Sequence, residues 1–580
     1  MRELLRSLKA YRLPAFLAPL FKMLEAVFDL LVPVVVAKIV NEGIGTADAP
    51  GSEAVIWRWG LILAGMGVVG LAFSVTAQYF AARAATGCAA DLRSRLFRRI
   101  QTLGWSETDS LGTSTLITRM TSDVNQVQSG VNMFLRLFLR SPFVVAGAFV
   151  CALLISPVIS LIFLAAIAAM AVTVVVIMRV TSPRYRDNQK QLDLVTRVTR
   201  ENLTGVRVIR AFRMEERENE HFRGLNAVYT RRQLAVGRIS ALMNPLTLVA
   251  VNLGVVFVLY AGAKAVGGAS LLRGEVIALV NYMNQILVEL VKLANLVVTL
   301  SRGLASTKRV AQILAAEPEM TFPEVSAEPD PQAPAVAFDH VSFRYAGAGA
   351  ESLTDISFSC EPGQTVGIIG STGSGKSTAA HLIPRFYDAT EGEVRLYGRP
   401  AAAYTRERLR AMCGIVPQRA QLFTGTVRSN LLWGREDADD AALWAALEAA
   451  QAAAFVREKP GGLDAPVEQA GRNLSGGQRQ RLTIARALVG RPPILILDDS
   501  ASALDYATDA ALRTALRALD WHPTVFIISQ RTASIRHADL ILVLEDGRLA
   551  GVGTHDSLTR TCPVYREIHE SQYRKGDERA

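Results

Sequence analysis

The chain has 580 residues, of which 50% are hydrophobic and 20% are charged, and its formal net charge is +10. This length exceeds what one hydrophobic core serves, so at least two domains are expected, and the mixed composition indicates a membrane half joined to a soluble half. Most basic residues lie beside apolar stretches, where they set membrane orientation, which argues against a nucleic-acid-binding protein. Neither metal-ligand nor disulfide spacing is seen among the cysteines, which are Cys88, Cys151, Cys360, Cys413 and Cys562.

Residues 1–12 are basic and place Leu4, Leu5 and Leu8 on one helical face. This pattern predicts a helix that lies on the inner membrane surface. A positive flank to the first span is an almost equally good interpretation, and the layout is not that of a secretory signal peptide.

Six apolar stretches approach the roughly 20 residues that a membrane-spanning helix needs. The segments after the second and the fourth stretch are rich in arginine, so the positive-inside rule places both in the cytoplasm. Both chain ends and the soluble half are then expected on the cytoplasmic side of a multi-pass inner-membrane protein. The expected spans lie near 14–41, 56–84, 132–155, 157–180, 240–268 and 275–301.

Charged residues occur within the first and the last expected span. Lys22, Glu25 and Asp29 are spaced i, i+3, i+7, and Glu289 and Lys292 are spaced i, i+3. Because a charge at membrane depth costs several kcal/mol, each group needs a partner or a wet cavity. The pattern fits either a substrate-lining surface or ion pairs within each helix, and the sequence does not decide between them.

Proline and glutamate mark the end of the membrane half. Residues 316–334 have the composition of a linker, which divides the chain into an all-α transmembrane domain of six helices at 1–315 and a soluble domain at 335–580. In the soluble domain, the apolar run 366–369 indicates a buried strand, followed by a glycine-rich loop and the start of a helix. This order predicts an α/β P-loop nucleotide-binding domain.

The glycine-rich loop contains every residue type that a P-loop needs. Its backbone N–H groups would surround the α- and β-phosphates of ATP, Lys376 would reach the β/γ oxygens, and the Ser377 hydroxyl would ligate Mg²⁺. A second apolar run, 494–497, ends in Asp498, which would also hold Mg²⁺. The loop consists of Gly370, Ser371, Thr372, Gly373, Ser374, Gly375, Lys376, Ser377 and Thr378.

The signature motif of the ATP-binding cassette (ABC) proteins is matched between these two motifs by Leu474, Ser475, Gly476, Gly477 and Gln478. With six expected spans ahead of one cassette, the chain resembles a half-transporter of the ABC exporter type over nearly all of its length.

This resemblance implies ATP and Mg²⁺ as ligands and assigns roles to further residues. Tyr345 would stack under the adenine ring, Gln418 would contact Mg²⁺ and sense the γ-phosphate, and residues 502–505, which end in Asp505, would form the D-loop. Coupling helices are expected near 108–118 and 204–213. The signature motif is expected to act on ATP that is bound to a second cassette.

Two catalytic positions depart from the family pattern. Asp499 stands where the family has the glutamate that polarises the attacking water, and Gln530 stands at the switch-loop histidine. Aspartate is one methylene shorter, and glutamine cannot accept a proton or carry positive charge. Because a displacement of about 1 Å can cost on the order of 10²-fold in rate, ATP binding should survive better than hydrolysis. Residues 467–471 also differ from the family pattern.

Together these features predict one subunit of a heterodimeric ABC exporter, whose signature motif completes the catalytic site of a partner half-transporter. The expected substrate is an amphipathic small molecule or drug in a lipid bilayer, and lipid, peptide or siderophore transport are alternatives on the same scaffold. A non-transporting ATP-binding regulatory membrane subunit is the rival from another class. No nucleic-acid partner is expected.

Overall fold

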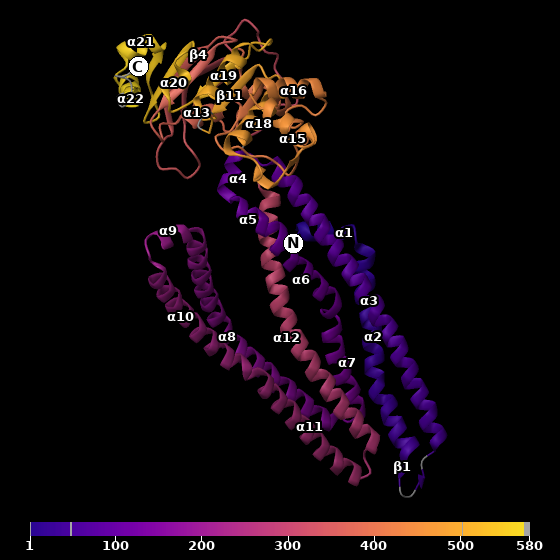
Figure 1. The fold of residues 1–580 in the computed structure, drawn as a ribbon. Helices are drawn as coiled ribbons and strands as arrows, with labels where there is room; N and C mark the ends of the chain where they lie inside the picture. Colours follow the sequence, from indigo (N-terminus) through magenta and orange to yellow (C-terminus); the bar gives the residue numbers. More distant parts are fainter. Residues whose placement is uncertain (1, 47–48, 51, 319, 501–502, 574–580) are drawn as a thin grey trace. The chain divides into compact units, whose positions relative to one another are not determined.

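The computed structural model describes residues 2–46, 49–50, 52–318, 320–500 and 503–573 (Figure 1). The chain forms two compact units. One, the membrane unit, comprises Met1–Gln101 and Ser114–Ala316, and the other, the ATPase unit, comprises Thr102–Thr113 and Glu317–Ala580.

The membrane unit is built from long helices. The third, α3, has 50 residues and α8 has 48, so both are longer than a bilayer crossing requires. The helices α8 and α10 run side by side, as do α8 and α11 (Figure 1). The elements are α1 (Arg2–Lys9), α2 (Arg12–Lys38), η1 (Ile39–Ile44), β1 (Gly45–Thr46), β2 (Ala49–Pro50), α3 (Glu53–Thr102), α5 (Thr113–Thr118), η2 (Arg119–Asp123), α6 (Val124–Leu137), α7 (Arg140–Ile155), α8 (Pro157–Thr204), α9 (Val206–Ala211), α10 (Glu215–Ala241), α11 (Met243–Gly267) and α12 (Arg273–Ala315).

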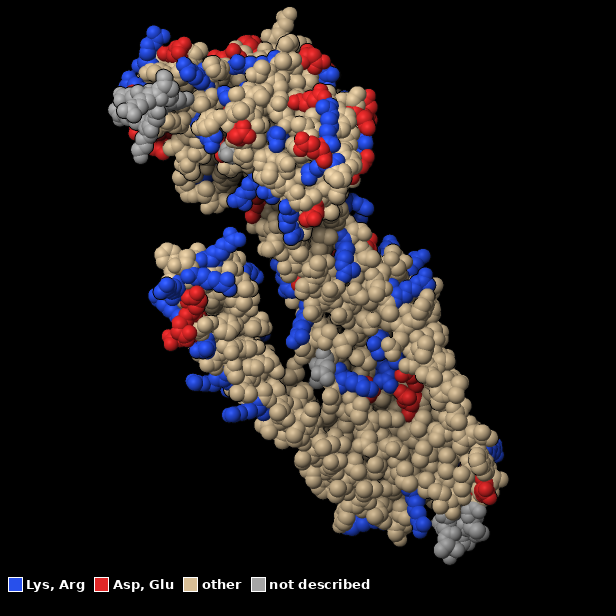
Figure 2. Space-filling model, viewed as in Figure 1, with Lys and Arg blue, Asp and Glu red and all other residues tan. Residues whose placement is uncertain are grey.

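Five helical stretches of the described chain are long and apolar enough to cross a membrane: Glu53–Thr102, Thr113–Ile155, Pro157–Thr204, Glu215–Gly267 and Arg273–Ala315. The first expected span falls on α2, which is a helix but carries Lys22, Glu25 and Asp29 and is not among the five. On the face shown in Figure 2, uncharged side chains cover most of the end of this unit that carries β1 and α11. Charged side chains gather toward α9 and α10.

Small residues and helix caps explain how these helices meet. Gly130 on α6 and Gly303 on α12 pack so closely that a Cβ on either would come within 3.3 Å of the other backbone. At the turn between α7 and α8, Ser156 caps the amide of Ile159 and Pro157 begins the helix, which places the cap and the proline at their favoured positions.

Charged residues of three helices meet in the membrane unit. Arg140 at the start of α7 bonds Glu289 of α12 and, at 2.7 Å, Asp29 of α2. The pairs expected within single helices are also present, between Lys22 and Glu25 and between Lys292 and Glu289. Because Arg140 joins carboxylates from different helices, the charges form one network rather than two separate pairs.

The ATPase unit contains two sheets. The larger has the order β14-β13-β5-β12-β11-β8, and its strands are parallel except for β14. Its members are β5 (Thr365–Gly370), β8 (Cys413–Val416), β11 (Ile494–Asp498), β12 (Thr524–Ile528), β13 (Leu540–Glu545) and β14 (Arg548–Gly553). The smaller, antiparallel sheet has the order β4-β3-β6-β7, with β3 (Val336–Phe343), β4 (Leu353–Cys360), β6 (Glu391–Leu396) and β7 (Arg399–Pro400).

Helices and short elements complete the ATPase unit: α4 (Trp105–Leu111), α13 (Lys376–Leu382), η3 (Ala401–Ala403), α14 (Arg406–Met412), β9 (Gly425–Thr426), α15 (Val427–Leu431), α16 (Asp440–Ala449), α17 (Ala453–Glu458), η4 (Gly462–Asp464), β10 (Pro466–Val467), η5 (Gln469–Gly471), α18 (Gly476–Val489), α19 (Tyr506–Arg517), α20 (Thr532–Ile535), α21 (His555–Thr561) and α22 (Pro563–Tyr573). The strands β5, β11 and β12 are almost wholly buried, as expected for parallel strands covered on both faces. Their carboxyl ends meet at one edge, where ligands bind in folds of this type.

The segment expected to be a linker packs on the ATPase unit. The amides of Ala327 and Asp330 donate to the carbonyls of Ala403 and Tyr397 at 2.9 and 3.0 Å. The Phe322 ring lies under two guanidinium groups, those of Arg385 and Arg406, each 4.8 Å from its centre. Such cation–π contacts hold the segment in place in spite of its proline content.

Candidate functional site

The glycine-rich loop joins the carboxyl end of β5 to α13. Gly373 and Gly375 have φ of +85° and +94°, a region that favours glycine, and a Cβ on Gly375 would come within 2.6 Å of the Ser352 carbonyl. The Lys376 ammonium donates to the carbonyls of Ser371 at 2.6 Å and Gly370 at 3.1 Å. The loop therefore curls around the ammonium group that would reach the phosphates.

The pKa of Lys376 is lowered by burial, and the nearby carboxylates of Asp499 and Asp498 oppose this shift. A buried ammonium that two carboxylates stabilise can exchange these contacts for phosphate oxygens. The position and charge of Lys376 thus suit the β- and γ-phosphates of a nucleotide.

Ser377 and Asp498, which together are called the metal corner below, lie side by side at the loop. The Ser377 hydroxyl donates to Asp498 at 3.0 Å, and burial raises the pKa of the Asp498 carboxyl. No group of three histidine, cysteine or carboxylate side chains that could hold a metal occurs in the described part of the chain. One hydroxyl and one carboxylate fit Mg²⁺, which uses few protein ligands and completes its shell with phosphates and water. Ser377 and Asp498 would hold the ion, and Gln418 lies close enough to donate to Asp499 at 3.4 Å.

A cavity of about 400 Å³ brings most of the predicted nucleotide residues together. Three further residues, Ser352, Ile528 and Ser529, line it without having been predicted. Gly370, Ser371 and Ser374 belong to the loop but do not line the cavity, and Ser374 is buried beneath it. The predicted residues in the lining are Tyr345, Thr372, Gly373, Gly375, Lys376, Ser377, Thr378, Gln418, Asp498, Asp499 and Gln530.

Tyr345 is positioned by two aromatic neighbours. Its ring meets Phe343 and Tyr387 edge-on, with centroids 4.8 and 5.3 Å away, and its hydroxyl is 3.1 Å from the Thr378 hydroxyl. Edge-to-face packing fixes the ring plane. The ring is therefore held beside the loop, where a purine could stack on it.

The signature residues lie outside this cavity. Ser475 caps α18, since its hydroxyl accepts from the Gln478 amide at 3.2 Å and the Gln478 side chain accepts from the Ser475 amide at 3.1 Å. Ser475 and Gly476 are exposed, and a Cβ on Gly476 would meet no atom within 4 Å. Asp505 caps α19 by accepting from Thr508 at 2.8 Å, whereas Ser502 of the expected D-loop lies outside the described residues.

The two departures from the family pattern lie in the same cavity. Asp499 has φ of +44° and its amide donates to Ile528 at 3.0 Å, so the carboxylate extends from a fixed turn after β11. Gln530 is exposed, and its backbone carbonyl accepts from Gln572 at 2.7 Å. Both side chains therefore face the position that a nucleotide phosphate would occupy.

A helix from the membrane half of the sequence belongs to the ATPase unit. In α4, Trp105 stacks on Phe386 at 4.4 Å, and Asp109 accepts a hydrogen bond of 2.7 Å from the Tyr387 hydroxyl. This helix overlaps the first expected coupling helix. The second overlaps α9, in which Val208 is exposed, as is Phe212 directly after it.

Comparisons with known proteins agree with this architecture. Residues 15–290 match the ABC transporter transmembrane region and residues 353–502 match the ABC transporter domain. The chain is 35% identical, over the full length of both, to an uncharacterized ABC transporter ATP-binding protein, YfiB, of Bacillus subtilis. It is 34% identical to an ATP-dependent lipid A-core flippase of Pseudomonas fluorescens, with 86% of this chain and 82% of the flippase covered.

A probable multidrug resistance ABC transporter, YheI of Bacillus subtilis, is 37% identical over 67% of this chain and 66% of its own length. Among solved structures, a bacterial Atm1-family ABC exporter with ATP bound superposes with a TM-score of 0.81 and 26% identity over 99% of both chains. The chain therefore belongs to the ABC transporter family, as an exporter in which a helical membrane domain precedes a nucleotide-binding ATPase domain.

Proposed function

We propose that this chain is one subunit of a heterodimeric ABC exporter, and that its own nucleotide site binds MgATP but hydrolyses it slowly. One observation carries the proposal: Asp499 and Gln530 lie in the same cavity as Lys376 and Ser377, which are intact. The residues that bind phosphate and Mg²⁺ are thus kept, and the two that would activate water are altered.

Each altered residue weakens hydrolysis for its own reason. Asp499 ends one methylene short of a glutamate, and its turn is fixed by the bond to Ile528, so the backbone does not compensate for the lost reach. Gln530 can donate to a γ-phosphate but cannot carry the charge of a histidine. The exposed Ser475 and Gly476 would complete a competent site on a partner chain, where hydrolysis would proceed.

The substrate is proposed to be an amphipathic small molecule. A cavity of about 490 Å³ in the membrane unit lies between α2, α7 and α12, with Val32, Val144 and Val288 beside Asp29 and Lys292. Both carboxylates are paired with Arg140, Asp29 at 2.7 Å, but the Asp29 side chain is 42% exposed, whereas that of Glu289 is buried. A cavity with apolar walls and a partly accessible ion pair suits an amphipathic molecule. The names of the multidrug and lipid A-core relatives support this class and the lipid alternative, respectively.

The chain is proposed to lie in the cytoplasmic membrane with its ATPase unit in the cytoplasm. The arginines that flank the long helices support this orientation by the positive-inside rule.

The test is the ATPase rate of this chain purified alone, beside an Asp499→Glu, Gln530→His double variant. We expect the native chain to be nearly silent and the double variant to gain at least about tenfold, because a better placed base and a charged switch residue are restored. Adding Lys376→Ala to the double variant should remove the gain and so locate it in this site. Ordinary transporter turnover by the native chain would contradict the proposal and favour a homodimer.

A further inference from the structure

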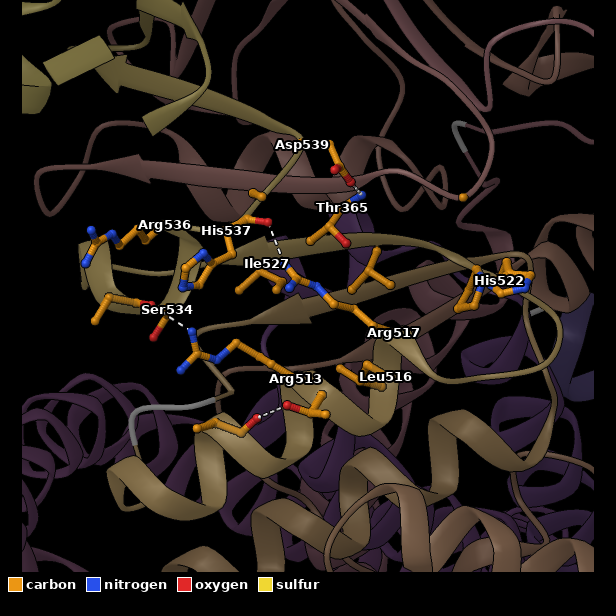
Figure 3. Close-up of a pocket in the computed structure, with 17 residues that line it drawn as sticks. Thr365, Arg513, Leu516, Arg517, His522, Ile527, Ser534, Arg536, His537 and Asp539 are labelled. Atoms are coloured by element: carbon orange, nitrogen blue, oxygen red, sulfur yellow. Dashed lines mark hydrogen bonds between the residues drawn. The ribbon is translucent and has the colours of Figure 1, made fainter. Parts of the chain in front are cut away.

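A second cavity, of about 700 Å³, lies in the ATPase unit, where α19, α20 and the strands β5 and β12 contribute to its lining (Figure 3). Thr365 and Val525, near the amino ends of β5 and β12, line this cavity, whereas the nucleotide cavity is lined by Ile528 and Asp498 at the carboxyl ends of β12 and β11. Parallel strands place all their amino ends at one edge, so the two cavities are separate. None of the residues that line this second cavity lines the nucleotide cavity or belongs to the signature motif.

The cavity combines an apolar floor with a basic rim. Leu516, Val525, Ile527 and Ala538 are buried and form apolar lining. In Figure 3 the Arg517 side chain points toward His537, Arg536 extends outward beyond His537, and His522 lies at the other end of the cavity. This volume is in the range of sites that take small organic molecules, roughly 300–1,000 Å³.

Among the described residues, two of the three arginines have no carboxylate partner. Arg513 is neutralised by Asp509 at 3.1 Å and also donates to the Ala533 carbonyl at 2.7 Å. Arg517 donates only to the His537 carbonyl in the described structure, and no hydrogen bond or ion pair there involves the Arg536 side chain.

The carboxylate in the lining, Asp539, already accepts from the Thr365 amide at 2.8 Å. The rim therefore has positive charge that the protein itself does not balance.

We propose that this cavity binds a small organic anion, with a flat apolar body on the floor and a phosphate, sulfonate or carboxylate at Arg517, where Arg536 adds positive charge from the outer rim. Guanidinium groups bind such anions through charge-assisted and often bidentate hydrogen bonds. The apolar floor favours a ligand that is more than an inorganic ion.

Occupancy of this cavity is coupled to the nucleotide site through one chain segment. In β12, Ile527 lines the second cavity and the next residue, Ile528, lines the nucleotide cavity, because successive side chains of a strand point to opposite faces. Gln530 then lines the nucleotide cavity, and Ala533 and Ser534 of α20 line the second one. A ligand that shifts α20 moves the switch residue, and any such coupling is reciprocal. This inference goes beyond the proposed function and does not depend on a partner chain.

The experiment uses the full chain in nanodiscs of neutral lipid, with 2-naphthyl phosphate as the probe and neutral 2-naphthol as the matched ligand control. Titration calorimetry should show saturable binding of the phosphate and much weaker binding of the naphthol. Arg517→Ala should weaken phosphate binding about tenfold, since it removes a charged donor, and Arg536→Ala should weaken it less, because Arg536 acts only through its charge. Arg548→Ala is the control, because Arg548 is an exposed arginine at the far end of the β13–β14 pair.

The possible results test the binding site and its coupling to the nucleotide site separately. Equal affinity in the native chain and Arg517→Ala would overturn the site. Loss of binding on Lys376→Ala would also overturn it, because the probe would then be assigned to the nucleotide cavity. For the coupling, the MgATP affinity measured with and without saturating probe should differ several-fold. An unchanged MgATP affinity would overturn the coupling. All these measurements use the single chain, so failure here and failure of the heterodimer proposal are distinguishable.

Discussion

At the scale of single residues, the nucleotide cavity contains an intact phosphate-binding loop beside two altered catalytic residues, Asp499 and Gln530. Asp499 and Gln530 follow neighbouring strands, β11 and β12, and the Asp499 amide is bonded to β12. Their effects on hydrolysis should therefore depend on each other, because one residue places the water and the other the γ-phosphate. Residues that act as a unit give non-additive effects.

We accordingly expect the gain in ATPase rate of the double variant to exceed the product of the gains of the Asp499→Glu and Gln530→His single variants. The measurement is a double-mutant cycle on the initial ATPase rates of the four purified chains at saturating MgATP. The Kd for MgATP serves as the control and should stay within about twofold across the cycle, since neither residue forms the phosphate loop. Gains that simply multiply would show that the two positions act independently.

A second residue-scale prediction concerns pH. Burial lowers the pKa of His555, helped by the positive charges of His569 and Arg536, and its ring is 2.8 Å from the Tyr565 hydroxyl. A histidine whose folded pKa is depressed contributes stability above its ordinary pKa of 6.5, and this stability is lost as pH falls below that value toward the folded pKa.

From pH 7.5 to about pH 5.5, the thermal unfolding midpoint of the ATPase unit should therefore fall further in the native chain than in His555→Gln, which cannot titrate. Differential scanning calorimetry of the full chain at the two pH values measures this. Arg548→Ala, on the neighbouring β14, is the control and should follow the native chain. An equal fall in the native chain and His555→Gln would count against the assignment.

The sequence could predict most of the nucleotide cavity, because phosphate chemistry demands particular residues at fixed spacing along one loop. Ser352 could not be found in this way, since it precedes β4 and approaches the loop only through tertiary structure. Ile528 and Ser529 carried a signal that was available, as they directly precede Gln530. The basic rim of the second cavity had no signal in the sequence, because its arginines are dispersed on α19 and beyond α20.

At the scale of elements, the short helix α4 is held by its contacts. Seven residues are too few for a stable isolated helix, so α4 depends on Trp105 against Phe386 and on Asp109 against Tyr387. The Trp105 ring also lies 5.8 Å from His381, whose Nε2 is 4.0 Å from Asp498. A chain of contacts therefore connects α4 with the metal corner.

We predict that Trp105→Ala leaves MgATP binding within about twofold of native but removes most substrate stimulation of the ATPase rate, because the stacked contact is lost on α4 and not in the nucleotide cavity. Reconstituted vesicles and an amphipathic cation such as ethidium provide the measurement. Ser110→Ala is the matched control, since Ser110 is exposed on the same helix and bonds only Glu107. Full stimulation in Trp105→Ala would show that α4 does not transmit the signal.

The charge network of α2, α7 and α12 is another element-scale feature, and the sequence could show only part of it. Spacing along single helices revealed Lys22 with Glu25 and Glu289 with Lys292. The central member, Arg140, lies on a third helix, and its partners are far away in sequence, so no periodicity could indicate it. The ion pairs within each helix are present, and the network also lies against the cavity of Asp29 and Lys292. That this cavity holds a substrate stays a prediction.

Removing Arg140 should lower the free energy of unfolding of the membrane unit. Arg140→Ala leaves the buried carboxylate of Glu289 without its interhelical partner, and breaking a buried ion pair in this way costs about 3–5 kcal/mol. We expect a lower thermal unfolding midpoint of the membrane unit in nanodiscs, and partial recovery in the Arg140→Ala, Glu289→Gln double variant, where the buried side chain at position 289 no longer carries a charge. Arg58→Ala, on α3 and outside the network, is the control. No recovery in the double variant would mean that Arg140 acts through packing instead of charge.

At the scale of the whole molecule, the chain has one complete set of binding motifs and an exposed signature that its own nucleotide cavity does not use. In a homodimer, both composite sites would contain Asp499 and Gln530 and would be equally slow. In a heterodimer the two sites differ, and mutations of the two motifs in this chain should have unequal effects. The ATPase rates of complexes that carry these mutations therefore show whether the two composite sites are alike.

The last prediction uses Gly476→Ala and Lys376→Ala in the complex purified from native membranes through a tag on this chain. A Cβ on Gly476 meets no atom of this chain within 4 Å, so Gly476→Ala should fold normally and leave this chain's own MgATP binding unchanged. It should nevertheless lower the ATPase rate of the complex by about 10²-fold, because it disturbs the donors offered to the partner's ATP in the transition state.

Lys376→Ala should instead abolish MgATP binding at this chain's site and leave most of the hydrolysis of the complex. Equal losses from the two variants would indicate a symmetric pair of sites and thus a homodimer, since each substitution would then affect both sites alike.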